Sequence, residues 1–164
     1  MPVAPIRSAA LFALVLALAA PVALAGGTTS HFTCRVTKTS QLDHLGRDGQ
    51  PAELSQFTCR VRGGLLDGFV ATGTNIWEPG KSRAVLIGSI VVARKANAAV
   101  VYEVQQATRT FTEAAGPAAR WEGAGRGTYK LATGPAAPLA GKSFRSIARY
   151  DGPGTFTIHA TIID

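Results

Sequence analysis

The stretch Phe-Thr-Cys-Arg-Val occupies residues 32–36 and recurs letter for letter at residues 57–61. Side chains of a β-strand point alternately to its two faces, so in each copy Phe, Cys and Val share one face while Thr and Arg share the other. The chain between the copies is rich in turn-forming residues, notably at 42–51. The repeat therefore predicts two β-strands that lie together with their cysteines facing each other.

Cys34 and Cys59 are the two cysteines of the chain. Their spacing matches neither a C-x-x-C redox motif nor a zinc-binding pattern, which leaves a structural role as the better interpretation. An even number of cysteines in an exported protein favours a disulfide bond. We therefore predict a Cys34–Cys59 bridge.

Residues 1–25 have the features of a secretory signal peptide. Arg7 supplies the positive charge, residues 9–20 form an unbroken apolar run, and Ala23-Leu24-Ala25 gives the small-x-small cleavage pattern. A transmembrane anchor needs about 20 apolar residues, and this run is shorter. We predict cleavage after Ala25, a mature chain of residues 26–164, and a secreted or periplasmic location.

The mature chain would carry a moderate positive charge. The full chain has 17 Lys and Arg against 10 Asp and Glu, and removal of Arg7 lowers the excess by one. The basic residues are scattered along the sequence and form no long run, which is typical of a solvated surface. The sequence therefore predicts no nucleic-acid partner.

The rest of the chain alternates between apolar and polar residues with a period of two, interrupted by Gly, Pro and Asp turns. No segment of the mature chain has the pattern of a long amphipathic helix. Together with the two repeat copies, these segments predict a single all-β domain, a small antiparallel barrel of about eight strands that leaves no exposed sheet edge. The further strands are expected at 69–77, 83–94, 99–112, 120–132, 143–150 and 155–163.

The barrel could be soluble or embedded in an outer membrane. An outer-membrane barrel has two girdles of aromatic residues and long external loops. Aromatic residues make up only 7% of the chain, and the last two residues, Ile163 and Asp164, are not aromatic. The sequence therefore favours a soluble barrel that does not span a membrane after cleavage of the signal peptide.

Residues 123–134, Gly-Ala-Gly-Arg-Gly-Thr-Tyr-Lys-Leu-Ala-Thr-Gly, are followed at 139–144 by Leu-Ala-Gly-Lys-Ser-Phe. This segment resembles the glycine-rich strand pair of the allene oxide cyclase and dirigent-like barrel superfamily. The resemblance implies an eight-stranded antiparallel barrel with an apolar cavity. Members of that superfamily either cyclise a bound lipid epoxide or hold a reactive intermediate in a fixed orientation.

Few side chains are candidates for a site. Glu103 lies on a strand from which a carboxylate could point inward, where desolvation would raise its pKa and suit it to acid–base catalysis. The alternation of side chains along this strand does not decide whether Glu103 faces the interior or the outside, because both faces of the strand begin with apolar residues. Trp77, Tyr102, Trp121 and Tyr129 are candidate ligand-binding aromatics, with a role in the core or at the rim as the alternative.

Other kinds of chemistry lack a motif. His31, His44 and His159 have no metal-ligand spacing, and the glycines at 123, 125 and 127 match no phosphate-binding loop. We expect no metal and no cofactor. The leading hypothesis is an exported, non-catalytic barrel that binds a small hydrophobic ligand or acts as an accessory protein of the cell envelope. The first alternative is a cofactor-free isomerase or cyclase assisted by Glu103. The second is a basic surface protein that docks on anionic glycans or lipids.

Overall fold

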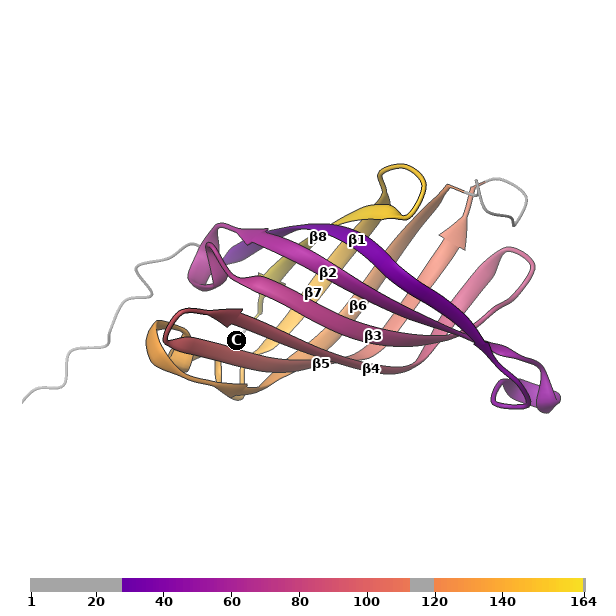
Figure 1. The fold of residues 1–164 in the computed structure, drawn as a ribbon, viewed down its shortest axis with the longest axis horizontal. Helices are drawn as coiled ribbons and strands as arrows, with labels where there is room; N and C mark the ends of the chain where they lie inside the picture. Colours follow the sequence, from indigo (N-terminus) through magenta and orange to yellow (C-terminus); the bar gives the residue numbers. More distant parts are fainter. Residues whose placement is uncertain (1–27, 113–119, 164) are drawn as a thin grey trace, which may run out of the picture.

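A computed structural model describes residues 28–112 and 120–163, in which eight antiparallel strands close into one barrel (Figure 1). Each strand pairs with the next along the chain, and the last strand pairs with the first. The predicted all-β barrel is therefore confirmed, while the predicted signal peptide and its cleavage after Ala25 lie outside the described residues. The strands are β1 (Thr29–Leu42), β2 (Ala52–Arg62), β3 (Val70–Glu78), β4 (Arg83–Lys95), β5 (Ala98–Phe111), β6 (Trp121–Ala132), β7 (Ser143–Tyr150) and β8 (Thr155–Ile162).

Alternation along each strand divides the barrel interior from its outer face. In β1, Phe32 and Cys34 are buried while Thr33 and Arg35 are exposed. The side chains that point inward form the hydrophobic core. Burial of these apolar side chains is the main favourable contribution to folding of a domain of this size.

The two copies of the repeat lie in β1 and β2, as the sequence predicts. Cys34 and Cys59 are directly opposite each other in the register of these strands, with a Cα–Cα distance of 4.0 Å, and they form a disulfide bond. Both cysteines are buried inside the barrel. The predicted bridge is confirmed, and it joins two neighbouring strands rather than opposite walls.

Four strands contain a bulge that changes which residues face inward. The residues that the register leaves without a directly opposite partner are Thr37 in β1, Ile87 in β4, Gln105 in β5 and Lys130 in β6. An extra residue in one strand reverses the alternation beyond it. In β5, for example, Val104 before the bulge and Ala107 after it both line the barrel interior.

One end of the barrel is closed by two short 3-10 helices. They are η2 (Gly64–Leu66) and η3 (Gly134–Leu139). Leu66 and Leu139 from these helices are fully buried over the adjoining core. None of the helices in residues 28–112 and 120–163 has the length and apolar character to cross a bilayer.

The opposite end of the barrel carries the β1–β2, β3–β4 and β7–β8 connections. The β1–β2 connection contains η1 (Arg47–Gly49), which lies at the far right in Figure 1. Arg47 anchors this loop to the end of β3, because its backbone N–H donates a hydrogen bond to Glu78 and its guanidinium forms an ion pair with the same carboxylate. The interior near this end is less densely filled, and it holds the candidate site.

Candidate functional site

The open half of the barrel contains two adjoining chambers. The inner chamber has a volume of about 60 Å³ and the mouth chamber a volume of about 260 Å³. Arg109, Trp121 and Phe156 line both chambers and therefore form the boundary between them. Other hollows of larger volume lie among outward-facing residues, such as the one lined by Thr58, Thr72 and Ile90.

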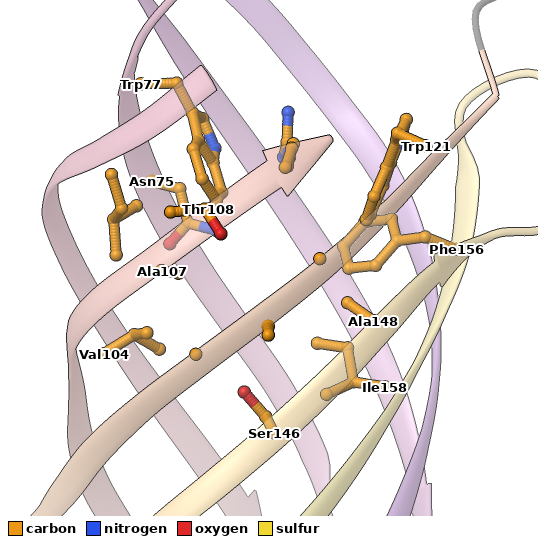
Figure 2. Close-up of a pocket in the computed structure, with 15 residues that line it drawn as sticks. Asn75, Trp77, Val104, Ala107, Thr108, Trp121, Ser146, Ala148, Phe156 and Ile158 are labelled. Atoms are coloured by element: carbon orange, nitrogen blue, oxygen red, sulfur yellow. The ribbon is translucent and has the colours of Figure 1, made fainter. Parts of the chain in front are cut away.

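The inner chamber exists because several of the strands around it carry small residues. Figure 2 shows Trp77 and Trp121 on opposite sides of the pocket, with Phe156 beside Trp121. Gly123 and Gly125 of β6 contribute no side chain here, and a Cβ atom at Gly125 would lie only 3.0 Å from the Cβ of Ala107. The chamber is therefore a space with aromatic and aliphatic walls and a backbone floor, which suits an apolar group.

Arg109 is the charged side chain at the centre of this site. Its guanidinium carbon lies 3.9 Å from the centroid of the Trp77 ring and 4.8 Å from that of Trp121, which are favourable cation–π distances. Its Nη1 donates a hydrogen bond of 3.5 Å to Oε1 of Glu53. Burial lowers the pKa of Arg109 to about 10, and the attraction of the Glu53 carboxylate partly offsets this effect.

The bulge at Gln105 explains why Arg109 points inward. Uninterrupted alternation from Val100, Tyr102 and Val104 would place residue 109 on the outer face. Because Gln105 is an extra residue in the pairing with β6, Ala107 and Arg109 turn to the interior instead. Arg109 is therefore not recognisable as an inward-facing residue from strict alternation, and the consecutive polar residues Gln105 and Gln106 are the signal in the sequence that indicates the break.

Three buried polar atoms in this region have no hydrogen-bond partner. They are Ser55 Oγ, Trp77 Nε1 and Arg109 Nε, and they are all the buried side-chain nitrogen and oxygen atoms without a partner in the described part of the chain. Each of the three residues lines one or both chambers. By contrast, Asn75 of the inner chamber accepts a hydrogen bond of 2.8 Å from Ser89.

The four aromatic residues singled out in the sequence fall into two groups. Trp77 and Trp121 line the chambers. Tyr102 and Tyr129 instead pack against each other and against Phe144 in the core nearer the closed end, with ring centroids 4.9–5.7 Å apart. Burial raises the pKa of Tyr129 to about 12 and raises that of Tyr102 further, with a smaller contribution from the nearby Tyr129.

Glu103 lies on the outer face of β5, away from both chambers. Its carboxylate forms an ion pair of 3.0 Å with Lys130, and each of the two side chains is 45% exposed. Lys130 reaches Glu103 because β6 also has an irregular register at this point. The structure thus places the candidate acid–base group in solvent rather than in the barrel interior.

Two of the three histidines are neighbours. His31 of β1 and His159 of β8 are directly paired in register on the outer face, with ring centroids 4.5 Å apart. His44 lies separately in the β1–β2 connection. In residues 28–112 and 120–163, no group of three or more His, Cys, Asp or Glu side chains is arranged to hold a metal ion.

The fold and the site together define a small closed β-barrel with one end packed and a polar–aromatic pocket towards the other. Comparison of the chain with protein-family models, curated protein sequences and solved structures finds no match. Functional inference therefore depends on the geometry of the pocket.

Proposed function

We propose that this chain acts after export as a binding protein that holds a small, largely apolar ligand in the open half of its barrel. The observation that carries the proposal is the inner chamber, which is walled by Trp77, Trp121 and Phe156 and floored by glycine. Small-molecule sites are typically concave and apolar, with a few convergent polar groups.

The size of the chambers limits the ligand. The inner chamber, at about 60 Å³, accommodates a hydrocarbon segment of a few carbon atoms, and the mouth chamber provides room for a polar end. Large lipids would require the walls to move. A small metabolite with one apolar part is therefore the proposed class.

Export of the protein is part of the proposal. It is supported by the signal-like residues 1–25 and by the Cys34–Cys59 disulfide, since such bonds persist in oxidising compartments.

Binding is favoured over catalysis because Glu103, the carboxylate proposed for an isomerase or cyclase, lies on the outer surface. The resemblance of residues 123–144 to allene oxide cyclase and dirigent-like barrels is compatible with either use of a cavity. No observation in the pocket favours the enzymatic alternative over binding.

The proposal is tested by mass spectrometry of small molecules that co-purify with the natively folded mature protein. We expect at least one small compound to be released on denaturation in an amount close to that of the protein. A matched preparation of the Ala148→Leu variant, which fills the inner chamber, should release much less of it. Equal amounts from both proteins would contradict the proposal.

A further inference from the structure

The buried polar atoms without partners indicate what the ligand must supply. Trp77 Nε1 and Arg109 Nε each carry an N–H that donates to no protein atom among the described residues, and the Ser55 hydroxyl is also unpaired. Burial of a donor without an acceptor is unfavourable, so most such groups in folded proteins are paired. The three residues that carry these atoms each line one or both of the two adjoining chambers. An acceptor, most simply an oxygen atom of a ligand or of water, satisfies the two N–H groups.

The surroundings of Arg109 indicate that the acceptor on the ligand carries a negative charge. A guanidinium has several N–H donors, yet among the described residues Arg109 donates one long hydrogen bond, of 3.5 Å, to Glu53. The Glu53 side chain is 41% exposed, so its carboxylate stays partly hydrated and neutralises the buried cation only in part. Trp77 and Trp121 contact the guanidinium through their rings. The N–H at Arg109 Nε is thus left without an acceptor from the protein among the described residues.

We propose that the ligand is a small monocarboxylate with an apolar body. Its carboxylate accepts hydrogen bonds from Arg109 Nε and from Trp77 Nε1 or Ser55 Oγ, and its apolar body occupies the inner chamber. This inference rests on the proposed function and names the ligand class of the same pocket. Charge-assisted hydrogen bonds from an arginine to a carboxylate are among the strongest polar contacts in proteins.

The charges in the pocket favour one negative charge on the ligand rather than two. Among the described residues that line the two chambers, Arg109 is the one cation and Glu53 the one carboxylate. A phosphate monoester carries nearly two negative charges at neutral pH and would be repelled by Glu53. A carboxylate places a single charge beside Arg109 and leaves the pair with Glu53 in place.

The experiment uses the mature protein and a series of straight-chain carboxylates from butanoate to decanoate, each compared with the primary alcohol of equal length. The chain contains two tryptophans, and both line the pocket, so their fluorescence reports directly on binding. Ionic strength is fixed at about 0.15 M to suppress weak surface contacts. We expect the best carboxylate to bind at least about tenfold more tightly than its alcohol.

Three variants connect this preference to the unpaired atoms. Trp77→Phe retains an aromatic ring and removes the N–H, Ser55→Ala removes the hydroxyl, and Arg109→Lys retains the charge without Nε. Each should weaken carboxylate binding by about threefold or more beyond any change in alcohol binding, so that the preference for the carboxylate over the alcohol of equal length falls. Arg35→Lys is the same substitution at an exposed position of β1 and serves as the matched control. It should alter neither carboxylate binding nor alcohol binding. If Arg109→Lys does not fold, the other two variants still decide the outcome.

The outcomes separate the two proposals. Equal affinity for carboxylates and alcohols would overturn the monocarboxylate inference and leave the binding function standing. Tighter binding of hexyl phosphate than of hexanoate, or carboxylate binding that none of the three variants weakens, would also overturn the inference. Failure of every probe to bind, together with the absence of any co-purifying compound, would overturn the proposed function as well.

Discussion

The guanidinium of Arg109 lies against the Trp77 ring, with 3.9 Å between the guanidinium carbon and the ring centroid, inside a barrel whose other half is packed with apolar side chains. A buried cation is costly unless it is paired, and Glu53 provides only a long, partly exposed contact. The indole rings compensate by cation–π attraction. Such a charge in an apolar pocket is more readily explained by ligand recognition than by stability, because apolar residues of similar volume often stabilise a fold equally well.

The inner chamber can be filled without disturbing the rest of the barrel. Ala148 of β7 lines it, and Ala148→Leu places additional carbon atoms in a space of about 60 Å³. We expect loss of ligand binding by fluorescence titration, while the free energy of unfolding in urea changes by about 1 kcal/mol or less.

A matched control is available at the adjacent position. Ile147 is 56% exposed on the outer face, so Ile147→Leu should alter neither binding nor stability. Retention of full ligand affinity by the Ala148→Leu variant would show that the ligand does not use the inner chamber.

The outer carboxylate provides a second test. Glu103→Gln removes an ion pair with Lys130 between two half-exposed side chains. Surface ion pairs contribute only about 0–1 kcal/mol, so we expect little change in the urea unfolding midpoint and none in ligand affinity. If the protein converts its ligand and this variant abolishes the conversion while binding persists, the catalytic alternative would replace the binding function.

Much of the fold could be predicted from the sequence because barrel strands alternate strictly over short distances. The two copies of Phe-Thr-Cys-Arg-Val place Cys34 opposite Cys59, as expected, and the predicted strands agree with the observed ones to within a few residues at most ends. The alternation of apolar and polar residues is a local property of each strand, because one face of the strand meets the core and the other meets solvent.

The site was harder to predict because it depends on where alternation fails. The bulges at Thr37, Ile87 and Gln105 each change the inward-facing set, and a bulge is specified by the pairing of two strands rather than by one strand alone. Trp77 and Trp121 could be singled out as aromatics. Arg109 looked like one more scattered surface charge.

The disulfide should matter for stability rather than for ligand binding. The paired variant Cys34→Ala with Cys59→Ala removes a bridge between residues 25 positions apart, and the chain-entropy relation predicts a loss of about 3.5 kcal/mol. Neither cysteine lines the two chambers, so the remaining folded protein should keep its ligand affinity.

Urea unfolding with and without reductant measures this effect. Reduction should lower the unfolding midpoint of the native protein and leave that of the paired variant unchanged. Free thiols detected on the native, folded protein would contradict the bridge itself.

Closure of the barrel depends on a glycine in β6. A Cβ atom at Gly127 would collide with the backbone carbonyl oxygen of Glu103 in β5 and would lie 2.6 Å from Cζ of Phe144 in β7. Backbone cannot move aside as a flexible side chain can, so Gly127→Ala should lower the free energy of unfolding by about 2–3 kcal/mol or prevent folding.

Gly88 of β4 is the matched control for this substitution. A Cβ atom there would make only ordinary contact, at 3.5 Å from Ile76 Cδ1. Gly88→Ala should therefore be neutral or slightly stabilising, because it reduces the conformational entropy of the unfolded chain. Equal stability of the two alanine variants would show that Gly127 is not required by close approach of the strands.

Alkaline pH tests the burial of the tyrosine pair. The folded-state pKa of Tyr129 is raised from 10.0 to about 12 by burial, so between these values the folded protein holds a proton that the unfolded chain has lost. Stability from this group is fully present below pH 10 and is lost as the pH rises. Burial of Tyr102 likewise makes the folded state less stable as the pH rises. The pKa of Arg109 is lowered to about 10, so this group instead makes the folded state more stable as the pH rises above that value.

The contribution of Tyr129 is isolated by comparison with Tyr129→Phe. For a shift of this size the linkage relation gives a loss of about 1.3 kcal/mol between pH 9 and pH 11. Between pH 9 and pH 11, the free energy of unfolding in urea should therefore decrease in both proteins. The decrease should be smaller in Tyr129→Phe than in the native protein, by about 1.3 kcal/mol. Tyr102→Phe should change the pH dependence in the same direction, because Tyr102 is buried in the same cluster. An identical fall in the native protein and in both variants would mean that these two phenols are ionised as readily in the folded barrel as in the unfolded chain.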